Sequence, residues 1–208
     1  KYSRMKLTPE NFPAGLKDTP FEYLIEEINK KSLLDIEFEL DRRYYAELVE
    51  LVKKLGRFEK KLIEPRVIEE ICLNNLLWAL RLRYYFNFTL EETKERLFPS
   101  GYPEIVNQVE KFYSLPLDNP DSWKDWKYKH LLTLDSAGDL DPGAAEAHSR
   151  KLLQSKYRRL FYQPPFTLAS VYAFFRLKWY EVGMIKSVTE GVKTGISPSE
   201  LAAITGVS

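Results

Sequence analysis

The sequence predicts an all-α protein, and three observations support this fold class. Apolar residues recur at spacings of three and four over long segments, as they do on one face of a helix. Glycine is scarce, with 9 in a chain of 208 residues, and strand-like alternation of apolar and polar residues is hard to find. With 44% apolar residues, the chain can bury a sizeable core.

Three helices are predicted in the first part of the chain. Pro20 opens one over 21–31, and Gly56 ends another over 34–55. A third spans 59–86, bent or begun afresh at Pro65. The second helix carries an apolar stripe that we expect on one face: Leu40, Tyr44, Leu48, Leu51 and Leu55.

Shorter helices are predicted next. Thr89 and Glu92 have the spacing of a capping box and open a short helix over 90–98. A further helix is expected over 102–114, and a short one bearing two tryptophans over 123–134.

The segment 134–146 is the most loop-like part of the chain, and we place a boundary there. The predicted halves are residues 1–133 and 134–208. In the second half, helices are expected over 144–162 and 166–193. The latter is apolar on most sides, so we expect it to be mostly buried.

The two halves share a plan, in which a long apolar helix ends in a capping box. Thr89 and Glu92 match Ser197 and Glu200, which lie 108 residues later. Two stacked helix-hairpin units of similar design are therefore predicted.

Composition excludes several classes of protein. The net charge is +1, so nothing global indicates a nucleic-acid partner. Cys72 is the only cysteine, which rules out an intrachain disulfide. The most apolar window, 166–185, contains Arg176, Lys178 and Glu181, so we expect a helix that does not span a membrane. Position 1 is not Met and no apolar signal segment follows it, and we interpret the chain as a fragment or a processed product.

No catalytic or metal-binding constellation is recognisable, so neither an enzyme nor a cofactor is expected. His130 and His148 are 18 residues apart without partners at helical spacing. The loop after Asp135 lacks the ligand positions of a calcium-binding loop. Glu37 and Asp41 are interpreted as surface acids, and no phosphate-binding or nucleophile-elbow motif is present.

Arg81 and Arg83 interrupt the apolar part of the third helix. They point about 200° apart around its axis, so they cannot both lie on one solvent-exposed side of the helix. Because an unpaired buried charge is prohibitive, we expect Arg81 to pair with a carboxylate inside the fold. On that expectation Arg81→Leu would cost about 3–5 kcal/mol of stability.

The segment 150–159 has five basic residues and no acid. It is interpreted as a solvated face or as the docking face for an acidic protein. An alternative is a helical scaffold or an RNA-binding module that uses this face through charge and stacking.

The segment 68–102, "IEEICLNNLLWALRLRYYFNFTLEETKERLFPSGY", resembles a repeat of the family formed by the C and d subunits of V-type ATPases. This family comprises the C subunit of archaeal and bacterial A/V-type ATPases and the d subunit of eukaryotic vacuolar ATPases. Cys72 stands where the family has an acid, with Glu69 and Glu70 close by. The matching residues are Asn75, Leu76, Arg81, Thr89, Glu92, Pro99 and Gly101.

The segment 165–201 resembles the C-terminal repeat of the same family. Met184 stands where Asn is expected, and Lys186 stands where Arg is expected. The matching positions are Lys178, Glu181, Ile185, Lys186, Gly191 and Lys193.

The resemblance implies two of the three pseudo-symmetric helical repeats of a funnel, the middle one over 1–133 and the C-terminal one over 134–208. It also implies a non-catalytic rotor component of the central stalk. Such a protein lies peripherally on the cytoplasmic face of the membrane, receives the axle formed by the D and F subunits, and seats on the membrane ring of proteolipid c subunits. No cofactor, small-molecule substrate or nucleic acid is implied. The residues expected to bind partners or to join the repeats are Asn75, Arg81, Arg83, Lys178, Glu181 and Lys186.

Overall fold

The fold is helical throughout the part of the chain that the computed structural model describes. Its single β feature there is an isolated bridge between Leu134 and Leu140. The predicted all-α class is therefore confirmed. The chain divides into two compact units, residues 1–45 and 46–208. The described residues are 16–27, 30, 33–98, 102–163, 166–197 and 201–202.

The first unit contains α2 (Leu24–Glu27) and the beginning of α3 (Leu33–Lys53). Where one helix was predicted over 21–31, the described residues contain only the four residues of α2. The guanidinium of Arg43 on α3 lies 3.6 Å from the centroid of the Tyr23 ring, a cation–π contact with the residue that precedes α2.

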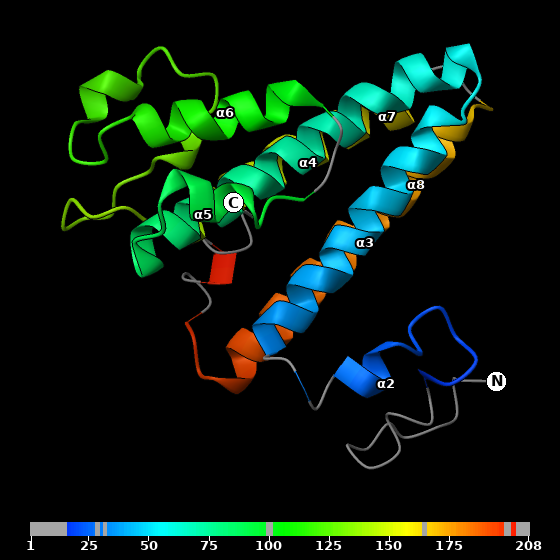
Figure 1. The fold of residues 1–208 in the computed structure, drawn as a ribbon, viewed down its shortest axis with the longest axis horizontal. Coiled ribbons are helices and arrows are strands. Elements are labelled where there is room, and N and C mark those ends of the chain that lie inside the picture. Colours follow the sequence, from blue (N-terminus) through cyan, green and yellow to red (C-terminus); the bar gives the residue numbers. More distant parts are fainter. Residues whose placement is uncertain are drawn as a thin grey trace. The chain divides into compact units, whose positions relative to one another are not determined.

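The second unit is organised around α4 (Arg57–Phe86), a helix of 30 residues that continues through Pro65. Helices α6 (Pro103–Ser114), α7 (Pro142–Phe161) and α8 (Leu168–Lys193) all pack against it, and α7 and α8 also form a hairpin (Figure 1). The core follows from this packing, because α4 contributes many of its fully buried side chains. The largest of these are Val67, Glu70, Ile71, Leu73, Asn75, Leu76 and Leu80.

The capping box after α4 is confirmed. The backbone N–H of Glu92 donates to the Thr89 hydroxyl, and the Glu92 carboxylate accepts from the backbone N–H of Thr89. The helix that follows, α5 (Leu90–Lys94), is shorter than predicted, whereas α6 agrees with its predicted range.

The helix predicted over 123–134 is wrong. Two short 3₁₀ turns, η2 (Pro120–Trp123) and η3 (Lys129–Leu131), take its place. The tryptophans explain the difference, because each is held by contacts outside the segment. The Trp123 indole donates to the carbonyl of Pro116 at 2.7 Å, and Trp126 stacks on Phe112 with ring centroids 5.8 Å apart. Anchoring these rings on α6 and the residues that follow it prevails over local helix formation.

The apolar stripe predicted on α3 does not form its buried face. In the 46–53 part of α3, Val49 and Val52 are buried at 3% exposure, whereas Leu51 is 54% exposed. The buried row lies one position away from the predicted stripe. Both rows have helical spacing, so periodicity alone could not choose between them.

The prediction that the helix over 166–193 is mostly buried is wrong. Helix α8 forms as expected, but its buried residues are only Ala169, Ala173 and Gly191. Large apolar side chains remain on its solvent side, including Phe175, Trp179 and Ile185.

The second capping box lies outside the described residues, because positions 198–200 are not among them. Within the described ranges, none of the helices combines the length and the apolar character that a membrane span requires.

The buried face of α3 can be tested with two neighbouring substitutions. We expect Val52→Ala to lower the free energy of unfolding by about 1.5–3 kcal/mol, because it removes buried apolar volume. Leu51→Ala should change it by less than about 0.5 kcal/mol, since Leu51 is largely in solvent. Urea denaturation followed by circular dichroism measures both, and a larger loss for Leu51→Ala would restore the predicted stripe.

Candidate functional site: a braced helical frame

A buried carboxylate joins the three longest helices of the second unit. Glu70 on α4 is 1% exposed and receives hydrogen bonds from Arg176 on α8 and from the Tyr157 hydroxyl on α7. Desolvation by burial, together with the nearby carboxylate, raises the pKa of Tyr157 well above its ordinary value, so the phenol is neutral and donates. The cluster therefore joins α4, α7 and α8 through one carboxylate.

Aromatic rings surround the buried guanidinium. The Arg176 guanidinium carbon lies 5.8 Å from the ring centroid of Tyr157 and 5.5 Å from that of Tyr180. Tyr157 and Tyr172 meet edge to face with centroids 5.7 Å apart. These contacts favour the charged group in a site from which water is largely excluded.

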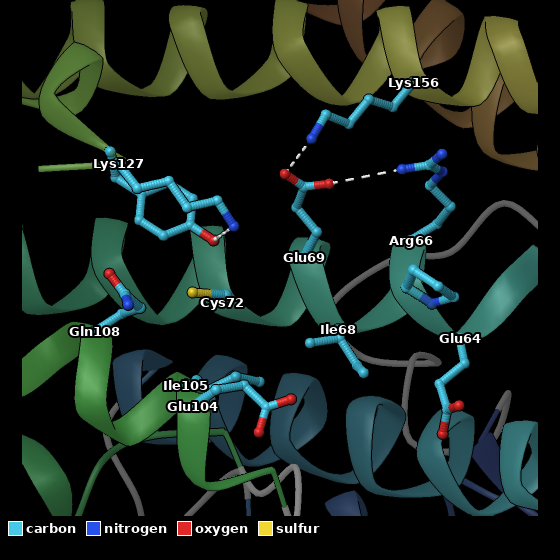
Figure 2. Close-up of a pocket in the computed structure, with 12 residues that line it drawn as sticks. Glu64, Arg66, Ile68, Glu69, Cys72, Glu104, Ile105, Gln108, Lys127 and Lys156 are labelled. Atoms are coloured by element: carbon cyan, nitrogen blue, oxygen red, sulfur yellow. Dashed lines mark hydrogen bonds and ion pairs between the residues drawn. The ribbon is translucent and has the colours of Figure 1, made fainter. Parts of the chain in front are cut away.

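A second pair of charges lies one position earlier on α4. Glu69 binds Lys156 of α7, and its other carboxylate oxygen lies 3.9 Å from a guanidinium nitrogen of Arg66 (Figure 2). The Glu69 side chain is 11% exposed, so this ion pair is also largely shielded from water. It adds a second polar link between α4 and α7.

Helix α4 also satisfies the ends of two neighbouring helices. The Glu59 carboxylate accepts hydrogen bonds from the backbone N–H groups of Leu168 and Ala169, each at 3.1 Å. These groups begin α8, where the helix dipole favours a negative charge. Near the other end of α4, Arg83 donates to the carbonyl oxygens of Phe112 at 2.9 Å and Leu115 at 3.0 Å.

These contacts explain why Arg83 lies in the apolar part of α4: its partners are carbonyls at the C-terminus of α6. A cation is favourable at that end of a helix. Burial lowers the pKa of Arg83 below its ordinary value. Arginine nevertheless stays protonated at physiological pH, so the charge is retained.

Asn75 fixes the segment that follows α5. Its side chain is fully buried and bonds both backbone groups of Phe98, accepting from the N–H at 2.7 Å and donating to the carbonyl at 3.3 Å. An asparagine amide can make both bonds at once because it has a donor and an acceptor on one group. Asn75 thus joins α4 to the chain after α5.

Arg81 has the expected carboxylate partner, but the pair is not buried. Its guanidinium lies 2.5 Å from the Glu146 carboxylate on α7, and the two side chains are 38% and 42% exposed. Glu146 also binds Arg150 at 2.9 Å. Water screens such a pair, so the cost expected for Arg81→Leu falls from about 3–5 kcal/mol to about 0–1 kcal/mol.

The remaining predicted residues take no part in these contacts between helices and lie on the solvent side of α8. Lys178 and Glu181 form an ion pair of 2.6 Å with side chains 54% and 49% exposed. Lys186 is also exposed. The structure thus brings Asn75, Arg81 and Arg83 into contacts between elements, whereas the three α8 residues face solvent.

A cavity of about 470 Å³ lies between α4, α6, α7 and the loop before η3. Its walls include Glu64, Glu69, Cys72, Lys127 and Lys156 (Figure 2). Glu69 and Lys156 bind each other, and burial raises the pKa of the Cys72 thiol, which disfavours the reactive thiolate. Among the described residues, no three His, Cys, Asp or Glu side chains are grouped to hold a metal ion.

The basic segment 150–159 is partly neutralised. Arg150 binds Glu146 and Lys156 binds Glu69, whereas Lys151, Arg158 and Arg159 remain exposed on α7. Fewer charges are therefore available to contact phosphates than the sequence indicates.

Comparison with known proteins assigns the chain to a family. The family model described as "ATP synthase (C/AC39) subunit" matches residues 5–204. The chain belongs to the ATP synthase (C/AC39) subunit family.

Two relatives of this C/AC39 chain are distant in sequence. An uncharacterized protein of Treponema pallidum (strain Nichols) is 25% identical over 166 residues, which cover 75% of this chain and 48% of that protein. The C subunit of the A-type ATP synthase of Methanosarcina mazei is 29% identical over 113 residues, or 54% of this chain and 31% of that protein. The matches span about half or less of each relative's length, and no solved structure matches.

The buried contact between Glu70 and Arg176 in this C/AC39 chain was not predicted from its sequence. There Glu70 stands out only as an acid near Cys72, and Arg176 only as a charge that argues against a membrane span. The signal is nevertheless present, since each charge interrupts an apolar segment of a long helix. Two such charges of opposite sign, on helices that must pack together, indicate a buried pair.

The buried and exposed arginines of the C/AC39 chain can be compared directly. Arg176→Met should lower the free energy of unfolding by about 3–5 kcal/mol, because it leaves Glu70 buried without its cation. Arg81→Leu should cost about 0–1 kcal/mol, since its partner is accessible to water. Thermal and urea unfolding measure both effects. Equal losses would show that burial does not distinguish the two pairs.

Proposed function

We propose that this C/AC39 chain acts as a non-catalytic adaptor in the rotor of an A/V-type ATPase. It would connect the D and F axle subunits to the membrane ring of c subunits and transmit torque between them. The observation that carries the proposal is the family match over residues 5–204. The relative from Methanosarcina mazei, which is named as a component of an A-type ATP synthase, supports it.

The polar contacts that join α4 to α6, α7 and α8 suit a mechanical role. Torque is transmitted only by a body that resists relative sliding of its parts. In this chain α4 is joined to α7 and α8 through Glu70, and it also satisfies the N-terminus of α8 and the C-terminus of α6. Such polar contacts have strict geometry, so they oppose both sliding and rotation of the packed helices.

The six predicted residues divide into two roles under this proposal. Asn75, Arg81 and Arg83 join elements of the chain, and they would keep the adaptor in shape. Lys178, Glu181 and Lys186 are exposed on α8 and would contact partner proteins. A peripheral position on the cytoplasmic face of the membrane follows from seating on the ring of c subunits.

The test is assembly from purified parts. The chain is mixed with a D–F complex and, separately, with a detergent-solubilised c-ring, and binding is measured by native mass spectrometry and size exclusion. We expect it to bind both and to bridge them when all are present. Absence of binding to either partner would contradict the adaptor role.

A charge-reversal control separates this role from RNA binding. The double variant Lys151→Glu/Arg158→Glu removes two of the three exposed basic residues of 150–159. It should leave binding to the axle and the c-ring unchanged. If instead the wild-type chain binds RNA at near-physiological salt and this variant does not, the RNA-binding alternative is favoured.

A further inference from the structure

The cavity between α4, α6, α7 and the loop before η3 has the size of a ligand pocket. Its volume of about 470 Å³ lies within the roughly 300–1,000 Å³ that small-molecule sites occupy. All of its walls belong to the second unit of the chain. Two of the helices that form them, α6 and α7, are held to α4 by polar contacts, so the cavity is pre-formed.

Most of the charges that line this cavity are already satisfied by the chain itself. Glu69 binds Lys156 and lies 3.9 Å from a guanidinium nitrogen of Arg66. Glu64 accepts a hydrogen bond from the Tyr102 hydroxyl at 2.8 Å. These groups therefore need no ligand to complete their contacts.

Lys127 and Glu104 are the two charges of the cavity wall that the chain does not pair. Among the residues that the structure describes, neither side chain takes part in an ion pair, and both are exposed. They lie on either side of α4, and both charges act on the thiol of Cys72 between them (Figure 2). The cavity thus presents one positive and one negative group that lack a counter-charge.

The side of the cavity that contains Lys127 is prepared for an anion. The Tyr128 hydroxyl accepts one hydrogen bond from the Lys127 ammonium at 3.1 Å, which leaves two of its three N–H donors for a ligand. The carboxamide oxygen of Gln108 accepts from the Trp126 indole at 3.2 Å, so its NH₂ group is left to donate elsewhere. A carboxylate bound here can accept hydrogen bonds from both side chains.

The cavity also has an apolar wall, which Pro65, Ile68 and Ile105 form. A ligand that fits the whole cavity therefore combines an anionic group, a cationic group and an aliphatic body. It has no net charge, because one free lysine and one free glutamate balance each other. A phosphate monoester fits less well, since its charge of about −1.5 to −2 would meet a single free lysine.

We propose that this cavity binds an aliphatic amino acid in its zwitterionic form. The ligand carboxylate accepts hydrogen bonds from Lys127 and Gln108, its ammonium group donates to Glu104, and its aliphatic part contacts Ile68 and Ile105. The ligand is bound and not converted, and it links the loop before η3 to α6. This site is separate from the exposed α8 residues of the rotor proposal and does not depend on it.

Isothermal titration of the full chain with two isomeric amino acids tests the proposal. L-leucine and 6-aminohexanoate have the same atoms but different separations between their charges. We expect at least one of them to bind about tenfold or more tightly than its analogues with a single charge, because each charged hydrogen bond contributes to affinity. These analogues are L-leucine amide and 4-methylpentanoate for the first, and hexylamine and hexanoate for the second. The proposal is overturned if neither isomer binds at up to about 10 mM, or if the analogues bind equally well.

Two variants assign the ends of the ligand. Lys127→Gln should weaken binding of the zwitterion and of the carboxylate analogue by about tenfold and leave the amine analogue unaffected. Glu104→Gln should do the reverse for the two analogues. The opposite pattern, or no effect of either variant, contradicts the proposed orientation and overturns the site. Circular dichroism verifies that both variants are folded.

Matched controls lie on the same loop and the same helix. Lys124 pairs with Asp121 at 2.7 Å, and Glu110 on α6 pairs with Lys94 at 2.8 Å. Neither lines the cavity, so Lys124→Gln and Glu110→Gln should leave the dissociation constant unchanged. Losses equal to those of Lys127→Gln and Glu104→Gln would show that the cavity is not the site.

Cys72 locates the ligand independently of these variants. It is the only cysteine of the chain and lines the cavity, so the rate at which methyl methanethiosulfonate modifies it reports occupancy. A zwitterion at about ten times its dissociation constant should slow the modification by roughly tenfold. An unchanged rate with bound ligand would place the ligand elsewhere and overturn the proposal. None of these outcomes bears on the rotor role, which is measured with the axle and the c-ring.

Discussion

The second unit depends on the need to neutralise one carboxylate that is almost completely removed from water. Glu70 is held at the junction of α4, α7 and α8, where its partners are Arg176 and the Tyr157 hydroxyl. A carboxylate buried without its cation would cost several kcal/mol, which is a large share of a domain's net stability. The three helices must therefore meet in an arrangement that brings both donors to it. Hydrophobic burial alone would accept several neighbouring packings, whereas these bonds accept one.

Polar contacts from helix α4 also fix the positions of the start of α8 and the end of α6. An apolar contact lets two helices slide at little cost, but a helix end has unsatisfied backbone groups at fixed positions. Glu59 takes up two of these at the start of α8, and Arg83 takes up two at the end of α6. Each neighbour is thus located along the axis of α4 as well as around it. A body fixed in this way can serve as a coupling element between other proteins.

Helix α8 shows how one apolar helix can serve two purposes. Small residues on its inward face, such as Ala169 and Ala173, allow close packing against its own unit, and this leaves the large side chains outside. A contiguous exposed apolar face of this kind marks an interaction surface.

Local patterns in the sequence determined the helical class, the positions of the long helices and the capping box at Thr89, because spacing and capping act within a few residues. They also indicated that Arg81 would find a carboxylate. Only the tertiary structure decided which face of α3 and α8 is buried, since both helices are apolar on more than one side. It also anchored Trp123 and Trp126 outside their own segment, and it joined Glu70 to Arg176 across 106 residues. The physical reason is that burial and charge pairing depend on distances between distant segments, and no local spacing records those distances.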